Sequence, residues 1–268
     1  MDSRGDPAAD RAPDSAAKVV GGLEEPRLEG GRRSSAHDAE LYQLRHTCQP
    51  TYIVIDASSS MQPHQNTLNR TLAQLHATIS ESPRVSEFAH MSLIAFSTDA
   101  HLIIEMTALD RIQAMPEVVC NGLTNYSAAF DLVRTRIETD VDDLRSMGMA
   151  VLRPVMFLLT DGAPTDQGWH DAFRRLVNRS WPRYPHVISY GFGAANPDVL
   201  GKVATKAAFL ADAGIDQDRA LLQALGSLLN SLVASARAEE TRIPRSTPGF
   251  TGQPVSEEYL TVPADHMD

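Results

Sequence analysis

Short apolar runs alternate with longer amphipathic segments between residues 47 and 238. A short β-branched apolar run is typical of a strand buried in a parallel sheet. Apolar residues that recur every three or four positions indicate a helix with one apolar face. The pattern predicts strands at residues 51–56, 91–96, 101–106, 154–159, 187–192 and 207–210. It predicts helices at residues 66–79, 127–137, 171–178, 196–205 and 218–236.

This alternation predicts an α/β fold: a doubly wound, mostly parallel six-stranded sheet with helices on both faces. Strands 91–96 and 101–106 are separated only by the turn Ser97-Thr98-Asp99-Ala100. Such a short connection permits a hairpin but no crossover. We therefore expect one antiparallel edge strand in the sheet.

The two ends of the chain lack this pattern. Residues 1–46 are rich in Ala, Asp, Arg, Gly and Pro, and residues 239–268 are rich in Pro and Thr without periodicity. Such segments bury too little apolar surface to offset the entropy lost on ordering. The expected organisation is a domain at 47–238 between two disordered tails.

Composition narrows the functional classes. The net charge is −10 and only 6% of residues are aromatic, which argues against a nucleic-acid or anionic-membrane partner. No stretch has the roughly 20 apolar residues of a membrane span, and the N-terminal residues do not resemble a signal peptide. Two isolated cysteines suit a reducing compartment. We therefore expect a cytoplasmic protein.

Three polar clusters carry the candidate chemistry. Asp56-Ala57-Ser58-Ser59-Ser60 follows the first predicted strand, Gly122-Leu123-Thr124-Asn125 precedes a predicted helix, and Thr160-Asp161-Gly162 follows strand 154–159. Ligands of open α/β sheets bind at the carboxyl ends of the strands. The clusters offer carboxylates and hydroxyls, with no His or Cys set nearby. Such oxygen donors favour Mg²⁺, with Mn²⁺ or Ca²⁺ as alternatives.

The spacing of the first cluster has a physical reason. Alternate residues of a loop that turns away from a strand end can face one point, so Asp56, Ser58 and Ser60 can converge. Serine hydroxyls are neutral donors, so a bound cation would still attract an anionic ligand from outside the chain.

Together the three clusters resemble the metal-ion-dependent adhesion site of von Willebrand factor A domains, over about residues 48–236. The resemblance implies the cation ligands Asp56, Ser58, Ser60, Thr124 and Asp161. It also implies that a Glu or Asp of a partner protein completes the coordination. The chain departs from the family at Ser59, where glycine is frequent, and at Cys120-Asn121, where small residues are frequent.

A narrower resemblance concerns residues 154–166, PVMFLLTDGAPTD. This run is similar to that of bacterial TerY-type A-domain proteins of tellurite-resistance and related stress clusters, often beside a protein kinase and a PP2C-type phosphatase. It implies a bacterial scaffold or signalling component, with a kinase/phosphatase signalling complex as the partner.

The sequence favours binding over catalysis, because the phosphate-binding, nucleophile-elbow and zinc-protease motifs are absent. Two alternatives stay open: a metal-free structural module, and a Mg²⁺-dependent phosphatase that forms an aspartyl-phosphate. Such phosphatases usually carry a second acid where Ser58 stands. Around the site, Asp99 and Asp166 are expected to be solvated loop acids, Asn125 a helix cap, and Trp169 a packing residue.

Overall fold

The computed structural model describes residues 46–81 and 83–256. The expectation of disorder in residues 1–45 and 257–268 lies outside these described residues. No helix among the residues described is long and apolar enough to cross a membrane.

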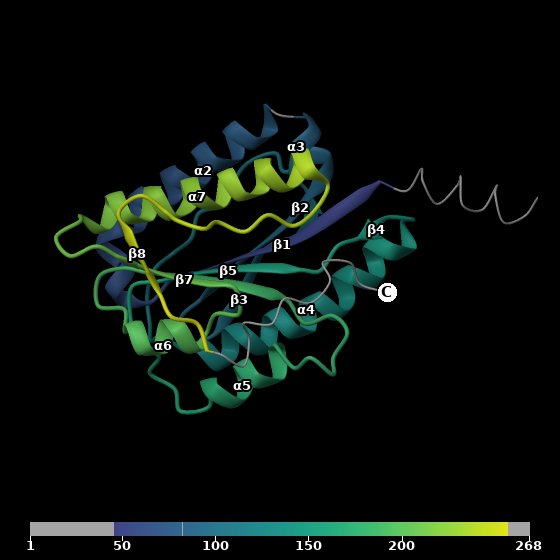
Figure 1. Ribbon diagram of the computed structural model, residues 1–268. Coiled ribbons are helices and arrows are strands. Elements are labelled where there is room, and N and C mark those ends of the chain that lie inside the picture. Colours follow the sequence, from purple (N-terminus) through teal and green to yellow (C-terminus); the bar gives the residue numbers. More distant parts are fainter. Residues whose placement is uncertain (1–45, 82, 257–268) are drawn as a thin grey trace, which may run out of the picture. The chain divides into compact units, whose positions relative to one another are not determined.

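Eight strands form one sheet in the order β3-β2-β1-β5-β6-β7-β8, with β4 paired to β1 (Figure 1). The strands are β1 Thr47–Asp56, β2 Ala89–Phe96, β3 Ala100–Ala108, β4 Ala150–Val151, β5 Val155–Thr160, β6 His186–Gly191, β7 Ala207–Ala211 and β8 Phe250–Gln253. The mostly parallel sheet and the antiparallel β2–β3 edge are confirmed. The sheet has eight strands rather than the six expected, because β4 and β8 are too short to carry a readable pattern.

The sheet is covered by helices on both faces, as predicted (Figure 1). Helices α2, α3 and α7 lie on one face, and α4, α5 and α6 lie on the other. The helices are α2 Gln65–Ser80, α3 Pro83–Phe88, α4 Tyr126–Ser146, α5 Trp169–Leu176, α6 Pro197–Lys202 and α7 Gln217–Ala238, with 3₁₀ turns η1 Ser59–His64 and η2 Leu109–Arg111.

Alternation along β1 divides the core into two layers. Ile53 and Ile55 pack with the helices of one face, whereas Tyr52 and Val54 pack with those of the other. Successive side chains of a strand point to opposite faces, so a strand buried on both sides must be apolar throughout. The register pairs Asp56 with Phe96 of β2 and Ile55 with Leu159 of β5. The carboxyl ends of these three parallel strands therefore meet at one edge.

Within the expected disordered tail at 239–268, residues 239–256 are described by the structure and differ from that expectation. Strand β8 pairs antiparallel with β7, so both edges of the sheet are antiparallel. Phe250 packs edge-on against Tyr190 with ring centroids 5.6 Å apart. These long-range contacts order a segment that has no local periodicity, because the buried aromatic surface offsets its entropy.

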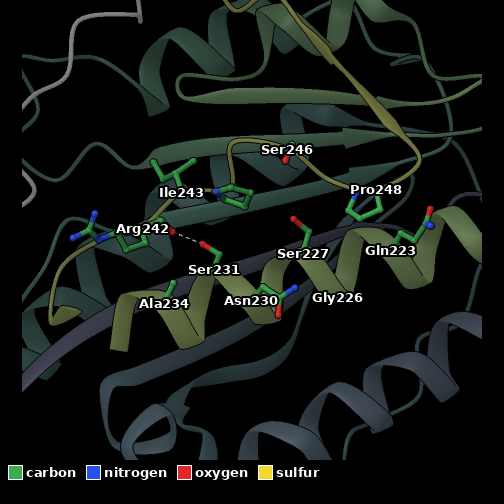
Figure 2. Close-up of a pocket in the computed structure, with 11 residues that line it drawn as sticks. Gln223, Gly226, Ser227, Asn230, Ser231, Ala234, Arg242, Ile243, Ser246 and Pro248 are labelled. Atoms are coloured by element: carbon green, nitrogen blue, oxygen red, sulfur yellow. Dashed lines mark hydrogen bonds between the residues drawn. The ribbon is translucent and has the colours of Figure 1, made fainter. Parts of the chain in front are cut away.

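Residues 240–249 run beside α7 (Figure 2). The hydroxyl of Ser231 on α7 donates to the carbonyl of Arg242, and the hydroxyls of Ser227 and Thr247 lie 2.8 Å apart. A groove of about 360 Å³ remains between the helix and the segment, and its lining includes Asn230 and Ile243. Serines spaced four residues apart on one helix face thus attach residues 242–247 to α7.

Candidate metal centre

The loops after β1 and β5 bring four of the predicted ligands together. The hydroxyls of Ser58 and Ser60 lie 3.0 Å apart, and the Ser60 hydroxyl donates to Oδ1 of Asp161 at 2.7 Å. The backbone N–H of Ser58 donates to Oδ1 of Asp56 at 2.9 Å. Asp56, Ser58 and Asp161 are buried, whereas Ser60 is exposed. The oxygens therefore form a continuous cluster that solvent can reach at Ser60.

The local chain path explains this convergence. Strand β1 ends at Asp56, and the next N–H, that of Ala57, still donates to the carbonyl of Phe96 on β2. The 3₁₀ turn η1 then begins at Ser59, anchored by the fully buried side chain of Met61. A strand end followed at once by a tight turn places alternate side chains of the loop around one point.

Thr124 reaches the same place from a separate loop. The N–H and the hydroxyl of Ser59 both donate to the carbonyl of Gly122, each at 3.0 Å. Gly122 has a φ of +81°, a conformation that favours glycine. A Cβ placed on Gly162 would lie 3.7 Å from Oγ1 of Thr124. The Thr124 hydroxyl therefore lies beside the Asp161-Gly162 turn, and it makes no hydrogen bond within the described residues.

A hydrogen-bond chain below the cluster orients Asp56. The hydroxyl of Thr160 donates to Oδ2 of Asp56 at 2.7 Å, and the hydroxyl of buried Tyr126 donates to Oγ1 of Thr160 at 3.1 Å. Both oxygens of the Asp56 carboxylate therefore have protein donors, which restrict its rotation. Sequence reasoning missed Tyr126, because nothing near it in the chain indicates a partner on β5.

The structure corrects the interpretation of Asp166 as a solvated loop acid. Its carboxylate accepts from the N–H of Tyr126 at 2.9 Å and from the hydroxyl of Ser127. It thereby places a negative charge at the N-terminus of α4, where the helix dipole favours one. Next to it, Thr165 donates its N–H to the carbonyl of Thr124 at 2.9 Å. The loop after β5 thus holds the loop that carries Thr124.

Other predictions for this rim agree with the structure. Asn125 caps α4, since its Oδ1 accepts from the N–H of Ala128 at 3.1 Å. Asp99 is exposed. Trp169 is a packing residue on α5, with its ring centroid 6.4 Å from that of Tyr126. The structure adds a contact that was not predicted: Nδ1 of His64 lies 2.7 Å from Oδ1 of Asp218 and so links η1 to α7.

The cluster has little positive charge around it. No Lys or Arg occurs in its loops at 57–65, 118–127 and 161–170. Burial raises the pKa of Asp56 to about 6, against the opposing effect of its hydrogen bonds, and burial also raises the pKa of Asp161. The charge of His64 lowers the pKa of Asp161, but by less than burial raises it. Two buried carboxylates whose loops supply no Lys or Arg are costly to ionise. A divalent cation would supply the missing charge.

The donor set fits a hard cation. Octahedral ligands at about 2.1 Å from Mg²⁺ lie roughly 3 Å from each other, close to the spacing of the Ser58, Ser60 and Asp161 oxygens. The residues described hold no group of three or more His, Cys, Asp and Glu side chains suited to a metal. The cluster instead combines two carboxylates with neutral hydroxyls, a set that favours Mg²⁺ or Mn²⁺ over softer ions.

In the metal-free protein, the free energy of unfolding should fall as the pH rises from about 4 to about 7. Burial raises the pKa of Asp56 from 3.8 to about 6, so the folded protein keeps a proton that the unfolded chain releases. At 1.36 kcal/mol per unit of pKa shift, the free energy of unfolding falls by on the order of 2–3 kcal/mol. This fall is complete once the pH has passed the pKa of Asp56 in the folded protein.

Urea unfolding in EDTA across this pH range, for the native protein and for Asp56→Asn, isolates this carboxyl from the other titrating groups. The asparagine variant should match the native protein near pH 4 and exceed it near pH 7. A stability difference that stays constant with pH would contradict the prediction.

Comparison with known proteins places this geometry in context. A model of the von Willebrand factor type A domain matches residues 52–223, more than half of the chain. No curated protein sequence matches the chain.

Solved structures share the fold. Proximal thread matrix protein 1 from the mussel byssus, with a zinc-occupied MIDAS motif, has a TM-score of 0.51 and 16% identity, over 70% of this chain and 49% of its own. The pilus adhesin SpaC from Lactobacillus rhamnosus GG, in an open conformation, has a TM-score of 0.53 and 13% identity, over 70% of this chain and 30% of its own. The chain thus spans half or less of the length of these two proteins, and at such identities the likeness concerns the fold.

Proposed function

Because the chain belongs to the von Willebrand factor type A family, we propose that it binds a divalent cation and, through it, a carboxylate of a partner protein. The ligands would be the five oxygen-bearing residues Asp56, Ser58, Ser60, Thr124 and Asp161. The observation that carries this proposal is the continuous Ser58–Ser60–Asp161 oxygen cluster, with two buried carboxylates and no Lys or Arg in the surrounding loops.

The donor set supports recognition of an outside acid. Five protein ligands leave one position of an octahedral ion free, and three neutral hydroxyls donate less charge than carboxylates. A Glu or Asp of the partner would fill that position. Ser60, the exposed member of the cluster, marks the side from which it approaches.

Mg²⁺ is the cation that we propose, with Mn²⁺ or Ca²⁺ as alternatives, because all donors are hard oxygens. The zinc in the byssus matrix protein belongs to that structure. Its presence supports a divalent cation in a fold of this kind.

We further propose a non-catalytic role, as a cytoplasmic scaffold or signalling component of a bacterial stress system related to tellurite resistance, with a kinase/phosphatase complex as partner. Two of the structural neighbours are named a thread matrix protein and an adhesin, which is consistent with binding rather than catalysis. Ser58 occupies the position where aspartyl-phosphate phosphatases usually carry a second acid. The competing possibility is a structural module that binds its partner without a metal.

A pull-down from lysate of the native cell tests the proposal. The native chain in Mg²⁺ should retain a partner that is lost in EDTA and lost with Asp56→Ala. Asp99→Asn, which removes an exposed acid from the same rim, should retain it and serves as the matched control. Partner binding that survives both chelation and Asp56→Ala would favour the metal-free structural module.

A further inference from the structure

The loop that precedes Thr124 exposes two large apolar side chains. Val119 is 65% exposed and Leu123 is 58% exposed. Across residues 46–81 and 83–256, the exposed large hydrophobics are Val119, Leu123, Met147 and Leu222. Half of them thus lie within five residues of one loop, directly before a predicted cation ligand.

From this placement we infer that the partner presents a single carboxylate flanked by large apolar residues, which pack on Val119 and Leu123. This inference rests on the proposed metal site, and it specifies the chemistry of the segment that carries the acid. We call Val119 and Leu123 the apolar shelf.

Hydrogen bonds hold the shelf in place. Asn69 of α2 donates its Nδ2 to the carbonyl of Val118 at 3.0 Å and accepts the N–H of Val118 at 2.8 Å. Gln65 accepts the N–H of Cys120 at 2.8 Å. The side chains of Val118 and Cys120 are buried on either side of exposed Val119. The loop therefore presents Val119 from a fixed backbone.

Hydrogen bonds also fix the backbone at Leu123. Its N–H donates to Oγ1 of Thr98 at 3.1 Å, and the carbonyl of Gly122 accepts two hydrogen bonds from Ser59. An apolar side chain on a fixed backbone loses little entropy when a partner covers it, so its burial contributes efficiently to affinity.

The shelf lies next to the proposed cation. Leu123 directly precedes Thr124. The N–H of Asn121, which lies between the two shelf residues in the chain, donates to the carbonyl of Ala57 at 2.8 Å, directly after Asp56. Neighbouring residues of an extended peptide are about 3.5 Å apart. Side chains beside a cation-bound acid can therefore reach the shelf.

The charges of the loops around the site favour a partner segment with a single acid. The rim loops at 57–65, 97–99, 118–127 and 161–170 contain no Lys or Arg. They carry Asp99 and Asp166 besides the two acids of the cluster. Additional acids on the partner would be repelled by these carboxylates and would meet no Lys or Arg in the loops. A run of acids should therefore bind less well than a single carboxylate.

Three end-blocked peptides test the inference, with the sequences Gly-Leu-Glu-Leu-Gly, Gly-Ser-Glu-Ser-Gly and Gly-Glu-Glu-Glu-Gly. Their affinities for the full chain in saturating Mg²⁺ and in EDTA are read from backbone NMR shifts. Partial burial of two leucine side chains predicts that the first peptide binds about tenfold more tightly than the second. The third should bind no more tightly than the second, and all binding should require Mg²⁺.

Variants locate the effect. Leu123→Ser and Val119→Ser should each reduce the preference for the leucine peptide to less than about threefold. Both should leave the affinity of the serine peptide unchanged. Met147→Ser removes an equally exposed apolar side chain just past the C-terminal end of α4, and it should keep the full preference. If Leu123→Ser disturbs the adjacent Thr124, its affinity for Mg²⁺ will change. In that case the result for Val119→Ser alone tests the shelf.

The outcomes separate the two proposals. Equal Mg²⁺-dependent affinities for the leucine and serine peptides would overturn the shelf and leave the metal site standing. A leucine preference that persists in both serine variants would also overturn it. Binding that is the same in Mg²⁺ and EDTA, or no binding of any peptide, would overturn the shelf together with the metal-bridged function.

Discussion

Replacing Asp56 by asparagine should lower the affinity for Mg²⁺ by at least about 100-fold, since loss of a group that merely supports a ligand already costs 10- to 100-fold. The substitution removes one of only two carboxylates among the five proposed ligands. The neutral amide retains the shape of the side chain and can still accept from the N–H of Ser58. The loss therefore reflects charge rather than misfolding.

The same variant should be more stable than the native protein when both are metal-free at neutral pH. A buried carboxylate whose pKa is raised to about 6 is ionised there at a cost that asparagine avoids. Weaker metal binding combined with higher metal-free stability is a pair of effects that general damage to the fold would not produce.

Isothermal titration with Mg²⁺ and urea unfolding in EDTA measure the two effects. Asp99→Asn is the matched control, because it removes an acid from the exposed rim and should change neither quantity by much. An asparagine variant that binds Mg²⁺ within about threefold of the native protein would contradict the ligand role of Asp56.

Replacing Phe250 by alanine should lower the free energy of unfolding by about 3 kcal/mol, the low end of the range for a buried phenylalanine. Phe250 is 9% exposed and belongs to the core cluster beneath α7, where it packs against Tyr190. It also begins β8, opposite Ala211 on β7. Loss of the ring would leave the edge strand without its main apolar anchor.

Urea unfolding near neutral pH measures this loss. Thr251→Ala is the control, because Thr251 is exposed and its hydroxyl bonds Asp212 at the surface; its cost should stay below about 1 kcal/mol. A Phe250→Ala cost below about 0.5 kcal/mol would mean that the C-terminal segment does not contribute to the folded domain.

Much of the site could be read from the sequence because its main residues follow strands. Asp56 and Asp161 each come directly after an apolar run, and parallel strands bring their carboxyl ends to one edge. The order of polar residues in the loops supplied Ser58, Ser60 and Thr124. The structure brings all five residues to that edge, and their role as ligands stays a prediction.

The supporting residues could not be read in this way. Asp166 caps a helix that begins 40 residues earlier, and Tyr126 reaches Thr160 across 34 residues. A cap is recognisable in a sequence when it stands next to its helix, as Asn125 does. When a residue of a distant loop caps the helix, the residues next to the helix in the chain give no sign of it.

The sequence by itself determined the elements that depend on local periodicity: the buried strands, the amphipathic helices, the antiparallel hairpin at β2–β3 and the polar strand ends. These follow from repeating patterns within about ten residues. Only the tertiary structure decided that residues 240–256 belong to the domain, that Asp166 is bound rather than solvated, and that Val119 and Leu123 stand exposed beside the site. Each of these depends on contacts between segments far apart in the chain, whose energies no local pattern contains.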